Sequence, residues 1–139
     1  MLNINRDSEI NLINLMIDHD LISVKDLLAI RKISNKATKP QIECVFELNP
    51  NSENSVVDIL VKEQDLEIID LSTIQASSEL KNLIPQEFID KNFIVPFKVD
   101  KENLHIAISD SSKLNLIKKL KTISKKNIEL YAAKVSQIS

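Results

Sequence analysis

The sequence predicts an α+β fold, in which amino-terminal helical hairpins precede a small mixed or antiparallel sheet packed by helices. Within residues 1–65, apolar side chains recur at helical spacing between capping residues. Within residues 93–108, apolar and polar side chains instead alternate, as they do along half-buried strands. A length of 139 residues suits one compact domain or two very small ones. We therefore predict a helical subdomain at 1–65 and a small α/β subdomain at 66–139.

The composition is ordinary for a soluble globular protein, with 43% hydrophobic and 27% charged residues. No apolar run approaches the roughly 20 residues that a membrane-spanning helix needs. The amino terminus lacks the basic segment followed by an apolar region that marks a secretory signal. These features predict a cytoplasmic protein.

The chain contains no glycine. Glycine-rich phosphate loops need residues without a Cβ so that the backbone can approach a phosphate closely. This absence excludes such a loop and predicts that the chain itself is not an enzyme.

Four helices are expected in the amino-terminal half. The first covers about 9–18 and is capped by Asp7 or Ser8, and the second runs from Val24 to Ile33 behind the cap Ser23. The face of the second helix is predicted to include Leu28, so Leu28→Asp is expected to destabilise this half.

The third helix follows Pro40 over 41–48, and the fourth opens at Ser52 or Ser55 and runs through about Glu63. Its apolar positions resemble those of the second helix. The likeness suggests an internal repeat of 29 residues, which pairs Asp20 with Asn49.

The second half reads as α/β. Its expected elements, in order, are a strand at 66–70, a turn capped by Ser77, a helix beginning at Pro85, a hairpin of 93–99 with 104–109, a helix capped by Asp110, Ser111 or Ser112, and a strand around 128–132. Pro96 is expected on an edge strand or at a bulge, because proline cannot donate a ladder hydrogen bond.

Charge is divided unevenly along the chain. Residues 1–70 contain 7 Lys or Arg and 13 Asp or Glu, whereas residues 71–139 contain 11 and 7. The basic excess gathers on and after the helix that follows Asp110, at Lys113, Lys118, Lys119, Lys121, Lys125 and Lys126. The last five are the predicted partner contacts, and the alternative is an ordinary solvated helix face. Nucleic acid fits poorly, because no aromatic or Arg residues are interleaved with these lysines.

No catalytic, cofactor-binding or metal-binding set is expected. His19 has no second histidine at metal-ligand spacing and is assigned to a solvated helix end. His105 is assigned to the surface or to a sheet edge, and Cys44 to a buried structural thiol. Glu87 and Asp90, the most tempting carboxylate pair, fit a solvated helix face.

Four short segments of the second half carry a family resemblance: Asp70-Leu71, Ile84-Pro85, Val95-Pro96 and Ala107-Ile108-Ser109-Asp110. With them, the chain resembles the amino-terminal domain of the type II secretion, type IV pilus and competence (DNA transformation) assembly ATPases. Ser111 stands where these proteins usually have proline.

In relatives that bind cyclic di-GMP, each of two helical motifs opens with Arg-Leu-Gly and has a second glycine. The corresponding triplets here are Asn11-Leu12-Ile13 and Pro40-Gln41-Ile42, and Asp20 and Asn49 stand at the second glycines. The loss of both arginines and all four glycines argues against inherited cyclic di-GMP binding.

The resemblance implies a noncatalytic docking or regulatory domain for protein transport. It would couple a hexameric motor, expected outside this chain, to the cytoplasmic part of an inner-membrane platform or adaptor protein, with no direct membrane insertion. No cofactor is implied. The alternatives are a divergent cyclic-dinucleotide sensor and a freestanding α/β adaptor.

Overall fold

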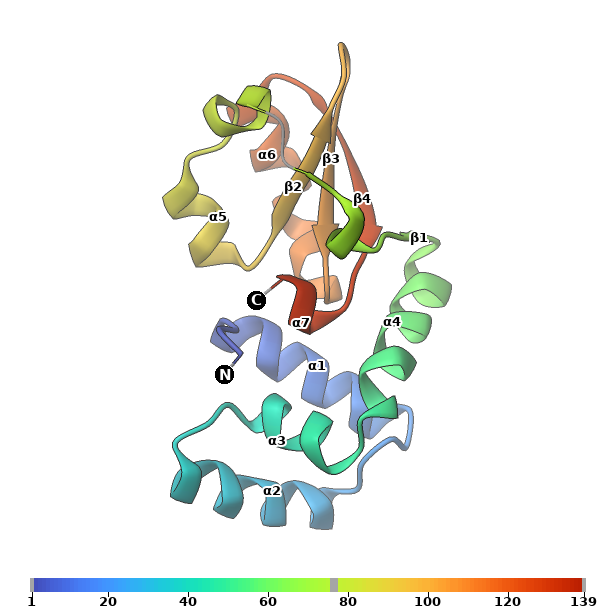
Figure 1. The fold of residues 1–139 in the computed structure, drawn as a ribbon. Helices are drawn as coiled ribbons and strands as arrows, with labels where there is room; N and C mark the ends of the chain where they lie inside the picture. Colours follow the sequence, from blue (N-terminus) through green and yellow to red (C-terminus); the bar gives the residue numbers. More distant parts are fainter. Residues whose placement is uncertain (1, 76–77, 139) are drawn as a thin grey trace.

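A computed structural model describes residues 2–75 and 78–138. Four helices come first: α1 (Arg6–Asp18), α2 (Val24–Ala37), α3 (Gln41–Leu48) and α4 (Asn51–Gln64). As Figure 1 shows, α2 and α3 form the layer farthest from the sheet, and α1 lies between that layer and the sheet. α4 runs along one side of the molecule and leads into the first strand.

The second half forms one mixed sheet with helices on it. Its strands are β1 (Glu67–Ile68), β2 (Val95–Val99), β3 (Asn103–Ile108) and β4 (Asn127–Ala132), in the order β1-β4-β3-β2. β4 runs parallel to β1 and β3, whereas β2 and β3 form an antiparallel hairpin. The remaining elements are η1 (Leu71–Thr73), η2 (Ser78–Asn82), α5 (Gln86–Asn92), η3 (Ser111–Leu116), α6 (Ile117–Ser124) and α7 (Val135–Ile138). The predicted α+β class is confirmed.

Two hydrophobic clusters hold these elements together. In the first, Leu12 and Met16 of α1 belong to the same cluster as Phe97 and Ala107 of the sheet. In the second, Leu60 of α4 belongs with the opposite face of the sheet. Each cluster includes residues from both sides of position 65, so α1 and α4 tie the helical half to the sheet. The division at 65 stays a prediction.

Several helix ends differ from the predicted ones. α1 begins earlier than expected because the side chain of Asn5 accepts the Ser8 N–H at 2.8 Å, and Ser8 itself is buried. α4 begins after Pro50 without a side-chain cap, so neither Ser52 nor Ser55 caps it. The buried Ser52 hydroxyl instead donates to the carbonyl of Asn49. Ser77 lies outside the described residues.

Other local predictions are confirmed. Ser23 and Asp26 form a reciprocal capping box at the start of α2, and the Asp110 side chain accepts the Ser112 N–H. Pro96 lies on the edge strand β2, beside a register shift between Pro96 and Lys98. Phe93, in contrast, is not part of the strand, because it ends α5 in the left-handed region at a φ of 54°.

The face that α2 turns toward the protein was predicted only in part. Leu27 and Ile30 are buried, but Leu28 is 55% exposed. Successive residues of an α-helix are rotated by about 100°, so Leu28 points away from the buried face that contains Leu27. The assignment of Leu28 to the packed face of this helix is therefore wrong.

We predict instead that Leu27→Asp lowers the free energy of unfolding by more than about 3 kcal/mol, because it buries a charge and leaves a cavity. Leu28→Asp serves as the matched control and is expected to cost less than about 1 kcal/mol. Urea denaturation of both variants measures the difference. Equal midpoints would show that the packed face of α2 is assigned wrongly.

A chain without glycine must end its helices with other residues. Among the described residues, those with positive φ are Asp20, Thr38, Asp65, Phe93 and Lys125. Thr38 is the residue least suited to this geometry, since a β-branched side chain crowds the backbone there. Its N–H still bonds the carbonyl of Ser34 and closes α2.

We expect Thr38→Gly to stabilise the protein by about 0.5–1 kcal/mol, because relief of the left-handed geometry exceeds the added unfolded-state entropy. The corresponding rise in Tm is about 2–4 °C. Ala37→Gly, one residue earlier and inside the helix, should lower Tm. A lower Tm for Thr38→Gly as well would refute this reading of the helix end.

Candidate ligand cleft and partner surface

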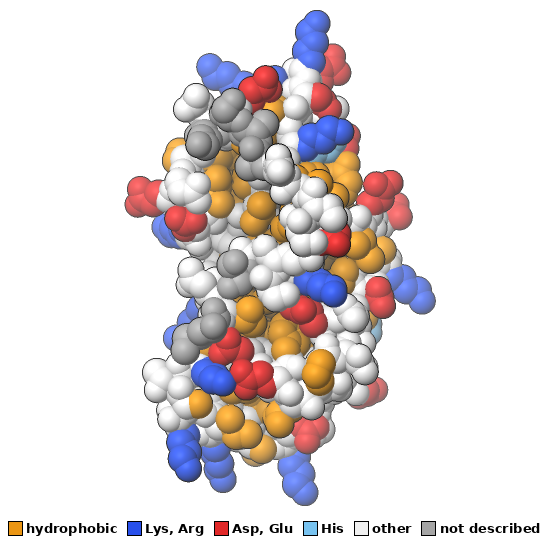
Figure 2. Space-filling view, in the orientation of Figure 1, with side chains coloured by type: hydrophobic (Ala, Val, Ile, Leu, Met, Phe, Trp, Pro, Cys, Tyr) orange, Lys and Arg blue, Asp and Glu red, His pale blue; other side chains and the backbone are white. Residues whose placement is uncertain are grey.

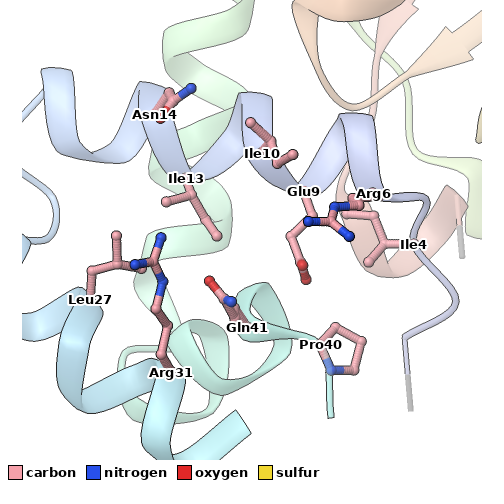
Figure 3. A pocket seen from close by; sticks show the side chains of 10 residues that line it. All are labelled: Ile4, Arg6, Glu9, Ile10, Ile13, Asn14, Leu27, Arg31, Pro40 and Gln41. Carbon is pink, nitrogen blue, oxygen red and sulfur yellow. The ribbon is translucent and has the colours of Figure 1, made fainter. Parts of the chain in front are cut away.

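A cleft of about 680 Å³ opens between α1, α2 and the start of α3 (Figure 3). Half of its ten lining residues are apolar and half are polar. The lining residues are Ile4, Arg6, Glu9, Ile10, Ile13, Asn14, Leu27, Arg31, Pro40 and Gln41. The volume of the cleft lies within the range of small-molecule sites.

The polar groups enter the cleft from different elements. Arg6 and Glu9 come from the first turn of α1, and Arg31 comes from α2 on the same side as Leu27, four residues earlier. Figure 3 shows the Arg31 side chain reaching from α2 toward α1, and the Glu9 carboxylate pointing toward the start of α3. Two guanidinium groups therefore flank the cleft, against one carboxylate.

Glu9 has a structural role there. Pro40 precedes α3 and supplies no side-chain cap, so the first N–H groups of this helix need another acceptor. Glu9 Oε2 accepts the N–H of Ile42 at 3.4 Å. A carboxylate is favourable at the positive end of a helix, so this contact joins α1 to α3. The negative charge of Glu9 also offsets part of the positive charge of the two arginines.

The cleft includes some of the motif positions identified in the sequence. Ile13, Pro40 and Gln41 line it, whereas Asp20 is not one of its lining residues. Asp20 has a φ of 58°, the left-handed geometry that glycine adopts readily, so the backbone shape at this position is kept without glycine. Asn49 differs, with a φ of −140°. The two halves of the proposed repeat therefore end their first helices differently.

Arg6 and Arg31 were not recognised as site residues from the sequence. Arg31 lies near the carboxyl end of the predicted second helix, Val24 to Ile33. Its spacing from Leu27 was the signal that places it on the cleft side. The predicted first helix covers about 9–18 and so leaves Arg6 outside it. In the structure Asn5 caps the helix, which places Arg6 in the first turn of α1.

The predicted partner lysines lie on and after α6. Lys118, Lys119, Lys121 and Lys125 are exposed, and the Lys119 ammonium lies 5.3 Å from the centre of the Phe88 ring. Lys126 is half-buried and donates to the carbonyl of Lys101 at 2.8 Å.

Lys113 is not part of this exposed surface. It is only 4% exposed, and burial lowers the pKa of its ammonium group while Asp110 and Asp7 act in the opposite direction. η3 places it against α1 rather than on the outer face of α6.

His105 also differs from its prediction. It lies on the interior strand β3 and is buried, neither at the surface nor at a sheet edge. Its Nδ1 is 3.1 Å from the Tyr131 hydroxyl, and its Nε2 is 3.2 Å from Asp100 Oδ2. The hydrogen bond from His105 lowers the pKa of Asp100, with help from two backbone N–H groups. This arrangement satisfies a buried polar side chain.

The other candidate reactive groups occupy structural positions. His19 ends α1 and its Nε2 lies 2.5 Å from Glu63 Oε1, while burial raises the pKa of the Cys44 thiol. Cys44 is a buried thiol, as predicted. Asp90 accepts a hydrogen bond from Gln86 rather than contacting Glu87. Within 2–75 and 78–138, no group of three or more His, Cys, Asp or Glu is arranged to hold a metal ion.

Comparison with known proteins identifies the family. The model of the MshEN domain matches residues 64–139, which is more than half of the chain and covers the sheet and its helices. The chain belongs to the MshEN domain family. The resemblance predicted from the four short segments is thereby confirmed.

Relatives and solved structures agree with this membership. The type IV pilus assembly ATPase PilB of Myxococcus xanthus (strain DK1622) is 24% identical over 119 residues, which cover 86% of this MshEN chain. They cover 21% of PilB, so the chain spans about a fifth of that relative.

Two solved structures share the fold. MshE with cdg is 20% identical with a TM-score of 0.57, over 91% of this chain and 92% of that one. The N-terminal domain of XpsE, in one crystal form, is 14% identical with a TM-score of 0.61, over 97% and 93%.

Proposed function

We propose that this MshEN domain is the noncatalytic amino-terminal docking domain of a bacterial secretion, pilus or competence assembly ATPase. It couples the motor to the cytoplasmic part of an inner-membrane platform or adaptor protein. The observation that carries the proposal is family membership, together with similarity to PilB over most of this chain and only a fifth of PilB. In this proposal, ATP hydrolysis belongs to the remainder of the protein.

The surface proposed for the partner is the exposed face of α6. Lys118 and Lys121 are three residues apart and exposed, so they lie side by side on that helix. Cationic side chains on the rim of an interface chiefly steer association and set specificity for an acidic partner. None of this requires a nucleophile or an acid–base pair.

No described helix is long and apolar enough to cross a membrane. In the proposed arrangement the domain is cytoplasmic and reaches the inner membrane through its partner.

We expect this domain to capture a platform or adaptor protein from detergent-solubilised inner membranes of its source, with the bound chains identified by mass spectrometry. Lys118→Glu/Lys121→Glu should weaken capture at least about tenfold, since each reversal replaces attraction with repulsion. The matched control is Lys25→Glu/Lys32→Glu, which makes the same charge change on α2 and should leave capture intact. Failure of the wild-type domain to capture such a protein would reject the docking role.

A second function, a divergent cyclic-dinucleotide sensor, is favoured by one observation. Arg6 and Arg31 flank the cleft, so two guanidinium groups are available although the motif arginines are missing. Guanidinium groups bind phosphate oxygens in a bidentate manner. MshE, which shares the fold, has been solved with cdg. Glu9 and the missing glycines weigh against this function, and we keep the prediction that the chain does not bind cyclic di-GMP.

Thermal unfolding with cyclic di-GMP distinguishes the two functions. A ligand that binds only the native state stabilises it by about 2.7 kcal/mol at one hundred times its Kd, which would raise Tm by several degrees. We expect no such rise at micromolar ligand. A rise that Arg6→Gln/Arg31→Gln abolishes, while Lys118→Gln/Lys121→Gln retains it, would establish the sensor and locate it in the cleft.

A further inference from the structure

The outer face of α2 carries a row of lysines that no other part of the described chain covers. Leu27, Ile30 and Ser34 are the buried residues of this helix. Lys25, Lys32 and Lys36 lie on the opposite side of the helix and are exposed. Figure 2 shows Lys and Arg side chains projecting at the end of the molecule that α2 occupies in Figure 1. The row extends over about 16 Å of helix axis.

The charge of this row is not balanced locally. α2 contains three lysines and Arg31 but only one carboxylate, Asp26. That carboxylate is occupied by the capping box, where hydrogen bonds from Ser23 lower its pKa. Among the described residues, none of the three lysines forms an ion pair. The cationic charge therefore faces solvent.

Aliphatic side chains flank the lysines. Val24 is 62% exposed, Leu28 55% and Ile33 45%, which places three of the large exposed hydrophobic residues of the protein on this one helix. Val24 and Leu28 are four residues apart and lie together on one side of the lysine row, with Ile33 on the other. These three aliphatic side chains are not buried by the packing of α2 against the rest of the protein.

We propose that the outer face of α2 is a peripheral docking surface for an anionic lipid bilayer. Lysines beside exposed aliphatic side chains, on the outside of a helix, are the composition that adsorbs at a lipid–water interface. The lysines contact anionic headgroups and Val24, Leu28 and Ile33 enter the headgroup region. This contact goes beyond the proposed function, which uses α6 and a protein partner.

An acidic protein is the competing occupant, and the composition of the face favours the bilayer. Protein interfaces concentrate their binding energy in buried aromatic and arginine anchors that fill pockets. The outer face of α2 has no aromatic residue, and its Arg31 side chain reaches into the cleft. A lipid surface needs no pocket, because headgroups rearrange around the side chains that reach them.

Co-sedimentation of the 139-residue chain with vesicles tests the proposal. Vesicles of phosphatidylethanolamine and phosphatidylglycerol should bind it, whereas vesicles of phosphatidylcholine should not. Raising the ionic strength from about 0.1 M to about 1 M shortens the Debye length from about 10 Å to about 3 Å and should release it. Binding that is equal on the two kinds of vesicle, or absent from both, would overturn the proposal.

Variants assign the contact to α2. One lysine strengthens adsorption to an anionic leaflet about fivefold, so Lys25→Glu/Lys32→Glu should weaken it by more than about twentyfold. Leu28→Asp, which leaves the packed face intact, should weaken it as well. Lys118→Glu/Lys121→Glu is the matched control and should retain binding to within about twofold, because α6 lies beside the sheet and α2 lies at the end of the molecule farthest from it (Figure 1).

Two results of the variant series would overturn the proposal. In the first, Lys25→Glu/Lys32→Glu binds anionic vesicles as the wild-type chain does. In the second, that variant loses capture of an acidic protein while the wild-type chain ignores vesicles. Because the docking role is tested through α6 capture of a platform protein, either proposal can fail without the other.

Discussion

Strand β3 is the element on which the rest of the structure depends, because it is covered on both faces. All of its residues from Leu104 to Ile108 are buried. Ala107 belongs to the cluster shared with α1, while Leu104, Ile106 and Ile108 belong to the cluster on the opposite face. A polar residue on such a strand must find its partners internally, and His105 does so with Tyr131 and Asp100. α1 packs against one face of this strand, and α6 packs against the other through Leu120.

The absence of glycine shapes both the helix ends and the cleft. Five described residues take positive φ at or near the ends of helices, where glycine would be the ordinary choice. Asp20 keeps the backbone geometry at its turn, and Asp and Asn tolerate this region better than other residues. Glycine would differ from Asp20 in having no Cβ, which is what allows another group to approach the backbone closely. The left-handed backbone at this turn is therefore formed by a residue that carries a Cβ.

Local sequence patterns predicted most helices and strands. The predictions that failed concern properties set by tertiary contacts. The hairpin, Pro96 at the sheet edge and the Ser23 capping box depend on spacing and on backbone chemistry within a few residues, so the sequence contained them. The exposure of Leu28 and the burial of His105 and Lys113 depend on which elements pack against them. The cleft depends on three helices meeting, and its arginines come from α1 and α2. No local pattern joins Arg6 to Arg31 across 25 positions of sequence.

Two cationic surfaces on one small domain can act independently because they occupy different ends of it. In Figure 1, α2 lies at the end farthest from the sheet, and α6 lies beside the sheet. At physiological salt, screening limits the range over which exposed charges interact to about 8 Å. Each surface therefore attracts a partner through its own lysines. The net charge of the chain is −2. Each surface can still attract an anionic partner, because the attraction depends on the charges near the contact and not on the net charge of the whole chain. A domain that contacted a bilayer through α2 would hold α6 away from that bilayer. α6 would then be presented to the cytoplasmic part of a membrane protein, so the two contacts would orient the domain together without competing for the same lysines.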